Sequence, residues 1–395
     1  MRKFFSILII FTLLQLNSLS YAQNITNKNI SILGAGDTMV HSPQLKAQYN
    51  QATNTYDFNN NYDFIREYVK SNDISICNLE TTFAGKDNGR YTTYPRFTSP
   101  DSLATAIKNA GFTHVSIINN HTNDKGYEGY KRTIEVLKNN NLKVLGGRLN
   151  QNEKNYIIED IKGKKIALTA YSYETKENKG RKTLNGIPVD PKMADLINTF
   201  NYDTLDKDLL KIKSDIDNMK EENADIIVFY IHWGYEYHLK EDEKQQYIAS
   251  KLNEYGVDLI LGSHPHVVQP VKTIKSYDEE NKLKKETLVA YSLGNILSNQ
   301  CYEILKKRHP EDGLILKVVF DDKLNKEASF IPTWVHRLNY KDGKRVYEIL
   351  PLHKALKNYE EYNLLKASSI TRAKNALNNT LEIFKNNNVI LEYMN

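Results

Sequence analysis

Two histidines separated by a single proline follow a short apolar run in the second half of the chain. Residues 257–261 read as a buried strand, and His264 and His266 follow after two small residues. Pro265 fixes its own backbone φ and biases His264 toward an extended conformation, so a loop here can aim both imidazoles at one point. Imidazole is a common ligand of transition metals, although His-x-His pairs are also common on protein surfaces. The pair therefore predicts a metal site only if other ligands converge on it.

Chemically active side chains also follow five other predicted strands. In each case the strand is short and apolar, and an acidic, amide or imidazole group stands where it ends. The stretches are Asp37 after 29–33, Asn78 and Glu80 after 73–77, Asn119, Asn120, His121 and Asp124 after 113–118, His232 after 225–231, and Asn295 after 287–291. Taken singly, each residue fits an ordinary turn or loop better than a metal site. Their recurrence at strand ends predicts one shared polar site.

Carboxylates, imidazoles and carboxamide oxygens together suit a divalent metal. Mn²⁺, Fe and Zn²⁺ accept this mixture, and Mg²⁺ is also acceptable to the carboxylates. The number of ions is open between one and two, because a bridging carboxylate can hold two ions roughly 3.5–4 Å apart. Such a pair polarises a phosphoryl group and lowers the pKa of a bound water, and a nearby histidine can protonate the leaving oxygen. The pattern favours metal-dependent hydrolysis of a phosphoester.

Predicted helices alternate with these strands and indicate the fold class. They cover residues 62–70, 99–111, 129–141, 205–222 and 241–255. The repetition of strand, motif and helix predicts a layered α/β domain over residues 29–312, with the polar residues at one edge of its sheets. Gly34 and Gly36 are expected to turn the backbone sharply after the first strand and so to deliver Asp37. Residues 174–202 are expected to form a segment that runs over one face of the domain.

The last part of the chain changes in character. Residues 313–320, 329–337 and 345–350 read as successive strands, and residues 359–384 read as a closing helix. No repeat or low-complexity linker separates this part from the rest. We therefore expect residues 313–395 to form a C-terminal β/α elaboration packed on the same domain.

The N-terminus resembles a secretory signal. Residues 1–22 contain a basic start, a short apolar run and the tripeptide Ser20-Tyr21-Ala22, typical of a cleavage site. An uncleaved N-terminal anchor is the alternative. No later stretch approaches the length of a membrane helix, so the mature protein is expected to be periplasmic, at the cell surface or secreted.

Charge and cysteine content exclude two classes of protein. The formal net charge of +5 becomes about +3 without the signal, and no basic run is interleaved with aromatic residues. The sequence therefore has no pattern typical of a nucleic-acid-binding surface. Cys77 and Cys301 are the two cysteines, which is too few for a disulfide framework. The two cysteines could form a single disulfide bridge or remain free, buried thiols, and the sequence does not decide between these alternatives.

The motifs also resemble a known family as an ordered set. They are Gly-Asp-Thr-Met at 36–39, Asn-Leu-Glu at 78–80, Asn-Asn-His-Thr-Asn-Asp at 119–124, His-Trp-Gly at 232–234, Gly-Ser-His-Pro-His-Val at 262–267 and Ser-Leu-Gly-Asn at 292–295. This set resembles the CapA-type capsule-synthesis proteins, which are associated with poly-γ-glutamate capsules and related to calcineurin-like metallophosphoesterases. The resemblance implies a metallophosphatase-like sandwich of two mixed sheets flanked by helices.

The resemblance further implies a role for each motif residue. Asp37 and His266 would bind a first ion, Glu80 would bridge two ions, and His121 would be the proton donor. Asn120, His232 and His264 would bind the second ion, Asp124 would orient His121, and Asn78, Asn119 and Asn295 would shape the pocket. The first motif of metallophosphatases is Asp-x-His, and here Met39 replaces that histidine. A thioether is a poor ligand for hard divalent ions, so the first site loses one imidazole.

Two functions follow from the resemblance. The first is an exported, metal-dependent phosphoester hydrolase in the synthesis of a capsule or cell-envelope polymer of the poly-γ-glutamate type. The alternative is a non-catalytic binding or scaffolding subunit of a polymer synthesis and export assembly. Hydrolysis or transfer at a γ-glutamyl amide is a third reading. The implied partners are an anionic polymer or phosphoester substrate and membrane-bound capsule-synthesis proteins.

Overall fold

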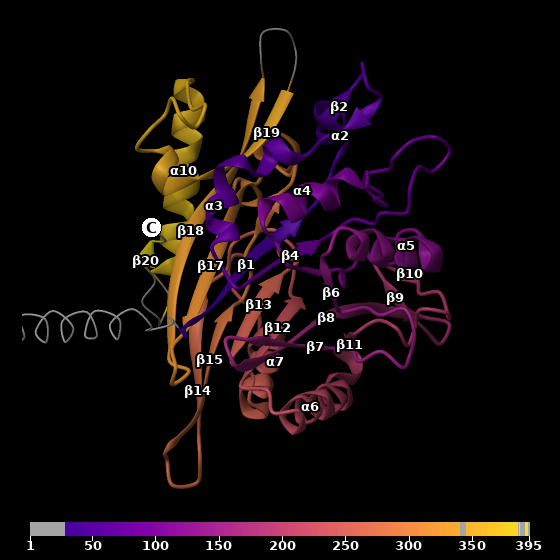
Figure 1. The fold of residues 1–395 in the computed structure, drawn as a ribbon, viewed down its shortest axis with the longest axis vertical. Helices are drawn as coiled ribbons and strands as arrows, with labels where there is room; N and C mark the ends of the chain where they lie inside the picture. The colour runs from indigo at the N-terminus through magenta and orange to yellow at the C-terminus, as the bar shows by residue number, and fades with distance from the viewer. Residues whose placement is uncertain (1–27, 340–344, 386, 388–391, 394–395) are drawn as a thin grey trace, which may run out of the picture.

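Two mixed β-sheets stack face to face in the computed structural model, with helices on the outside (Figure 1). The structure describes residues 28–339, 345–385, 387 and 392–393, so the predicted signal at 1–22 lies outside the described residues. The predicted fold class, a sandwich of two mixed sheets flanked by helices, is confirmed. Pairing is parallel among the strands that carry the motifs and out to β6, and it is antiparallel at the other three sheet edges.

Each sheet runs in an order that brings distant segments side by side. The first sheet has the order β19 (Arg345–Pro351), β18 (Lys326–Asn339), β17 (Asp312–Phe320), β1 (Ile30–Thr38), β4 (Ile74–Leu79), β5 (His114–Ser116) and β6 (Lys143–Leu145), with β16 (Asn295–Leu297) and β20 (Glu392–Tyr393) paired to β1 and β18. The second has the order β10 (Ile187–Pro188), β9 (Arg181–Leu184), β8 (Lys164–Asn178), β12 (Ile226–His232), β13 (Leu259–Ser263), β15 (Leu283–Ala290) and β14 (Val271–Tyr277), with β7 (Ile157–Ile161) and β11 (Thr199–Asn201) on β8.

The α-helices of the described chain connect and cover these strands. They are α2 (Ser42–Gln48), α3 (Arg66–Lys70), α4 (Ser102–Ala110), α5 (Gly126–Asn139), α6 (Leu205–Glu221), α7 (Glu243–Tyr255), α8 (Tyr302–Leu305), α9 (Leu352–Ala355) and α10 (Ala367–Phe384). α4 and α7 end at Gly111 and Gly256, which have φ of 109° and 102°. Glycine adopts this left-handed conformation without strain, so both helices stop there.

The second sheet is apolar on both faces because it is covered on both. Along β12, Val228 and Tyr230 belong to the core between the sheets, whereas Phe229 and Ile231 pack beneath α6 and α7. Successive side chains of a strand point to opposite faces, so a strand buried on both sides needs an unbroken apolar run. The Tyr230 hydroxyl spans the interface and donates to the Ala35 carbonyl of the first sheet at 2.8 Å.

Gly34 and Gly36 do not form the predicted turn. Both lie inside β1, and neither has a positive φ. A Cβ on Gly34 would stand 2.8 Å from the Leu261 side chain of the other sheet, and one on Gly36 would stand 1.9 Å from the Gly294 carbonyl oxygen. Gly34 is therefore required by the close packing of the two sheets, and Gly36 by the close approach of the segment that leads into β16 of the same sheet.

We expect Gly36→Ala to lower the free energy of unfolding by about 3 kcal/mol, the upper end of overpacking costs. The new methyl group would meet backbone, which cannot move aside. Gly34→Ala is the matched control, because its neighbour is the flexible side chain of Leu261. Urea unfolding of both variants measures the difference. Equal losses would contradict the proposed backbone clash.

The C-terminal strands complete the first sheet. β17 pairs antiparallel with β1 from Ile30–Phe320 to Ala35–Ile315, and α10 lies alongside β18 (Figure 1). The closing helix is shorter than predicted because it begins at Ala367 rather than at residue 359. Asn363 has φ of 55°, a left-handed conformation that interrupts a right-handed helix.

Two further observations complete the fold. Cys77 and Cys301 are both free and buried. Among the described residues, no helix combines the length and the apolar character needed to cross a membrane.

Candidate functional site

The motif residues gather where strands from both sheets end. Asp37 lies near the end of β1 and is paired in register with Asn295, the first residue of β16. His232 is the last residue of β12 and is in register with Ser263 of β13. Glu80 directly follows β4. Because these strands run parallel, their ends share one edge, and stacking of the sheets brings the two edges together.

A first group of ligand atoms joins Asp37, Glu80 and His266. One ligand atom from each residue lies within 4.8 Å of the others, and all three residues are buried. The His266 Nδ1 atom is 3.2 Å from the Asp37 carboxylate, and Nε2 is 3.6 Å from the Glu80 carboxylate. This combination of two carboxylates and one imidazole suits a divalent ion.

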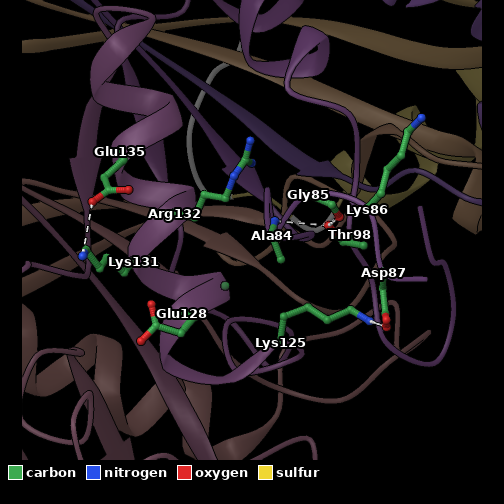
Figure 2. Close-up of a pocket in the computed structure, with 11 residues that line it drawn as sticks. Ala84, Gly85, Lys86, Asp87, Thr98, Lys125, Glu128, Lys131, Arg132 and Glu135 are labelled. Carbon is green, nitrogen blue, oxygen red and sulfur yellow. Dashed lines mark hydrogen bonds and ion pairs between the residues drawn. The ribbon is translucent and has the colours of Figure 1, made fainter. Parts of the chain in front are cut away.

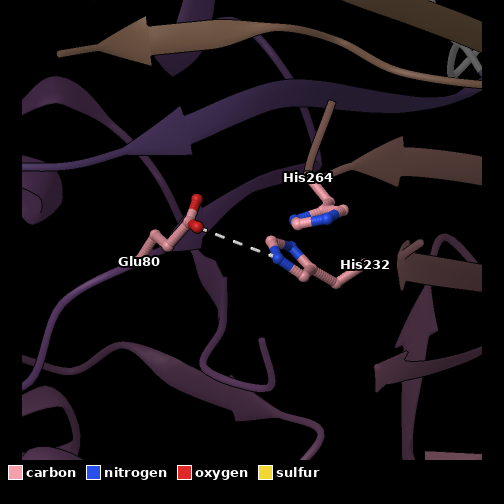
Figure 3. A group of neighbouring side chains, drawn as sticks. All are labelled: Glu80, His232 and His264. Carbon is pink, nitrogen blue, oxygen red and sulfur yellow. Dashed lines mark ion pairs between the residues drawn. The ribbon is translucent and has the colours of Figure 1, made fainter. Parts of the chain in front are cut away.

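A second group joins the same Glu80 to His232 and His264, again within 4.8 Å and fully buried. Figure 3 shows the Glu80 carboxylate facing the His232 ring, 3.8 Å from its Nε2 atom, with His264 alongside. The Asn120 carboxamide oxygen also lies 2.9 Å from His232 Nε2. The Ser263 hydroxyl lies 2.9 Å from His232 Nδ1 and so fixes the ring. Glu80 is thus shared by two adjacent groups.

The Glu80 carboxylate has no hydrogen-bond partner in this buried environment. Both of its oxygens are orphaned, and so is Nδ1 of His264. Burial raises the pKa of the Glu80 carboxyl well above its ordinary value, and Asp37 adds to the rise. Buried polar atoms normally find a partner, so these orphaned atoms fit a divalent ion as the absent partner.

Two of the three histidines are in the neutral state that metal ligation requires. Burial lowers the pKa of His232 and of His264 well below the ordinary value, which keeps both imidazoles neutral and able to ligate. Burial also acts to lower the pKa of His266, but Glu80 and Asp37 outweigh it and raise this pKa to about 10. Without an ion, His266 therefore carries a proton beside the two carboxylates, and a divalent ion would displace that proton on binding.

The loop around Pro265 is not extended as predicted. His264 has φ of 95° and His266 has φ of 56°, both in the left-handed region that favours glycine. Such strain is maintained only where surrounding contacts determine the conformation, and here the His264 N–H donates to the Asp37 carboxylate at 3.2 Å. The bias of a residue before proline is overridden by this contact.

A second pair stands beside the ligand groups. His121 Nδ1 lies 2.8 Å from the Asp124 carboxylate, and both residues are buried. The same oxygen of Asp124 accepts from the Phe97 N–H at 2.6 Å, and the Phe97 ring meets the His121 ring edge-on. Asp124 is therefore fixed and can orient the imidazole, leaving Nε2 of His121 to exchange a proton.

The three asparagines assigned to the pocket form hydrogen bonds behind the ligands. Asn78 donates to the Asp37 carboxylate at 2.8 Å, and Asn119 donates to the Asn78 oxygen at 3.1 Å. The Asn295 oxygen lies 3.1 Å from Nδ1 of His266. Contacts of this kind orient metal ligands without touching the metal. Met39 is buried at the end of β1 and, as a thioether, adds no hard ligand.

Three nearby residues were not predicted from the sequence. Glu236 has a carboxylate oxygen within 4.8 Å of ligand atoms of His264 and His266, the Tyr173 hydroxyl lies 3.2 Å from His264 Nε2, and Ser263 contacts His232. Glu236 follows Gly234 by two residues, so extending the His-Trp-Gly motif would have found it. Tyr173 lies inside a long strand, where no sequence signal separates it from packing residues.

A cleft of about 670 Å³ opens onto the second group. Its walls include Asn120 and His264 together with Tyr173, Tyr202 and Glu236. A different pocket, of about 530 Å³, lies at the start of α5 and mixes basic and acidic side chains (Figure 2). It includes Lys125, the neighbour of Asp124, but none of the ligand residues. The cleft of about 670 Å³ is therefore the one of these two that reaches the ligand groups.

Comparison with known proteins places the chain in a family. The family model described as "Bacterial capsule synthesis protein PGA_cap" matches residues 31–300. "Capsule biosynthesis protein CapA" of Bacillus anthracis is 28% identical over 274 residues, covering 67% of this chain and 59% of that protein. "PGA biosynthesis protein CapA" of Bacillus subtilis (strain 168) is 27% identical over 198 residues, covering 49% and 44%. The chain thus spans about half the length of these relatives.

Solved structures overlay more loosely. A putative 5′-nucleotidase from Staphylococcus aureus in complex with alpha-ketoglutarate aligns with a TM-score of 0.43 and 15% identity, covering 82% of this chain and 54% of that one. The Thermus thermophilus sulfate thiohydrolase SoxB in complex with glycerol aligns with a TM-score of 0.37 and 16% identity, covering 65% and 39%. At these scores neither overlay adds to the assignment.

Proposed function

Because the chain belongs to the bacterial capsule synthesis family PGA_cap, we propose that it is an exported, metal-dependent phosphoester hydrolase in the synthesis of a capsule or cell-envelope polymer. The observation that carries this proposal is the buried carboxylate of Glu80, which makes no hydrogen bond and is shared by two groups of ligand atoms. Burying a carboxylate without hydrogen bonds is costly, and divalent ions at this position would offset that cost.

Different residues of the chain would have different roles around the reacting group. Divalent ions in such a site polarise a phosphoryl oxygen and stabilise the charge that develops on it. Asp37, Glu80, His232, His264 and His266 would hold the ions, and Asn120 would complete the second group. His121, oriented by Asp124, would donate a proton to the leaving oxygen. The cleft lined by Tyr173 and Tyr202 would admit the substrate.

The substrate class and location are part of the same proposal. Both curated relatives carry names of capsule or PGA biosynthesis, which supports an anionic polymer or its phosphoester precursor as the substrate. Membrane-bound capsule-synthesis proteins would be its partners. The signal-like residues 1–22 support export. N-terminal sequencing of protein recovered outside the cytoplasm, beginning at residue 23, would test export directly.

One observation favours a second function. Met39 occupies the position at which the resemblance expects a histidine, so the first group has three ligands rather than four. A site of this kind could hold a polymer for a synthesis or export assembly without cleaving it. Both functions use the same cleft but differ in whether a bond is broken.

Elemental analysis of the purified mature protein tests the proposal. We expect one or two divalent ions per chain, and their loss in the His264→Ala/His266→Ala variant. His238→Ala replaces an exposed histidine outside the ligand groups and should leave metal content unchanged. Metal-dependent turnover of phosphoesters would support the hydrolase. Turnover of γ-glutamyl amides alone would support the third reading, and polymer binding without turnover would support the scaffold. A wild type that takes up no Mn²⁺ or Zn²⁺ would contradict the metal site.

A further inference from the structure

Glu236 stands apart from the other acidic residues of the site because it is exposed. It lies in the loop between β12 and α7, and its carboxylate is within 4.8 Å of ligand atoms of both His264 and His266. His264 belongs to the second ligand group, and His266 belongs to the first. Glu236 therefore faces both groups from the side of the cleft, opposite the buried end where Glu80 joins them.

The backbone around Glu236 is fixed to the loop that carries the two histidines. The Tyr237 N–H donates to the Pro265 carbonyl at 2.7 Å, and the Tyr237 ring lies 6.1 Å from the His266 ring. Tyr237 has φ of 66°, a strained conformation for a residue with a side chain. On the other side, the Gly234 N–H donates to the Tyr202 hydroxyl at 3.1 Å. These contacts hold Glu236 next to His264 and His266.

The first ligand group is short of one donor. It contains Asp37, Glu80 and His266, and Met39 supplies no hard ligand. We propose that Glu236 is an additional metal ligand, entering from the exposed side of the site and replacing with a carboxylate the imidazole that Met39 does not provide. This inference rests on the proposed metal site and assigns to it one further residue.

The exchange of an imidazole for a carboxylate changes which ion the site prefers. Two divalent ions bring four positive charges, and Asp37, Glu80 and Glu236 would bring three negative charges. A neutral histidine in place of Glu236 would leave one more positive charge uncompensated. Oxygen-rich ligand sets favour hard ions such as Mn²⁺ and Mg²⁺ over Zn²⁺. A carboxylate from Glu236 should therefore reduce the advantage that Zn²⁺ has over Mn²⁺ at sites rich in imidazole.

Calorimetric titration of metal-free mature protein with Mn²⁺ tests this assignment. Loss of a residue that merely orients a ligand weakens metal affinity about 10- to 100-fold, so Glu236→Gln should weaken one Mn²⁺ site at least tenfold. Asp203→Asn is the matched control, since Asp203 is an exposed acid of the same cleft outside the ligand groups. It should stay within about threefold of wild type. The Mn²⁺ electron paramagnetic resonance spectrum should change only in Glu236→Gln.

The outcomes separate this inference from the proposed function. If wild type binds Mn²⁺ and the dissociation constant of Glu236→Gln is within threefold of the wild-type value, Glu236 is not a ligand. The proposed metal site would then remain intact. Equal losses in Glu236→Gln and Asp203→Asn would also overturn the role of Glu236, because long-range charge would then explain both. A wild type that binds no Mn²⁺ would overturn the proposed function itself. Because Glu236 is exposed, circular dichroism should show a folded variant in every case.

Discussion

Replacing Glu80 with glutamine is expected to abolish divalent metal binding at both ligand groups without destabilising the metal-free protein. Glu80 is shared by the two groups, so its loss removes a charged ligand from each. At a free ion concentration 100 times the dissociation constant, metal stabilises wild type by about 2.7 kcal/mol, and this gain should vanish. The metal-free variant should unfold at the same temperature or higher, because neither oxygen of Glu80 makes a hydrogen bond and burial raises its pKa.

Glu311 offers a matched control for this substitution. It is a buried glutamate whose carboxylate pairs with Arg372 and Arg337. Glu311→Gln should therefore lower thermal stability with and without metal, while metal content stays at the wild-type level. Scanning calorimetry of Glu80→Gln and Glu311→Gln, each with and without Mn²⁺, measures the four unfolding temperatures. A metal-free Glu80→Gln protein that unfolds well below wild type would assign Glu80 a purely structural role.

Replacing His121 with alanine is expected to lower phosphoester turnover by about 10²- to 10⁴-fold, the range for loss of a general acid. Metal content should be unchanged, since His121 belongs to neither ligand group. Asp124→Asn should produce a smaller loss, because it removes the orienting charge beside Nδ1 and leaves the imidazole in place. The measurement compares turnover of substrates with good and with poor leaving groups. A good leaving group needs no proton, so its turnover should fall less in His121→Ala.

The exposed His238 provides the comparison for His121→Ala. His238→Ala should retain full turnover with every substrate. Equal losses in His121→Ala for good and poor leaving groups would contradict the role of proton donor. A loss of bound metal would instead place His121 among the ligands.

Strands that bury both faces were the most predictable part of the fold. β12 and β13 were expected at 225–231 and 257–261 and are found at Ile226–His232 and Leu259–Ser263. A continuous apolar run bounded by polar residues has few alternatives to a central strand. The same logic placed the motif residues at strand ends, and the structure brings Asp37, Glu80, His232, His264 and His266 into adjacent groups.

Features that depend on distant segments could not be predicted from local sequence. Gly34 and Gly36 were expected to form a turn, and only the positions of Leu261 and Gly294 show why glycine is needed inside β1. β14 was missed because only Val271 of its seven residues is fully buried, so its polar composition reads as loop. Glu236 was missed because it lies in a loop and is brought to His264 and His266 by tertiary contacts.

The pairing of β17 with β1 ties the middle of the first sheet to residues beyond the segment shared with the family. The family model ends at residue 300, yet the strand that carries Asp37 takes one of its three neighbours from residues 312–320, the others being β4 and β16. A fragment cut at residue 300 would leave residues 30–35 of β1 unpaired on one side in the middle of the sheet, although β16 would still cover the end of the strand. An unpaired strand edge of this kind invites pairing with another chain, so a fragment limited to the family segment should aggregate.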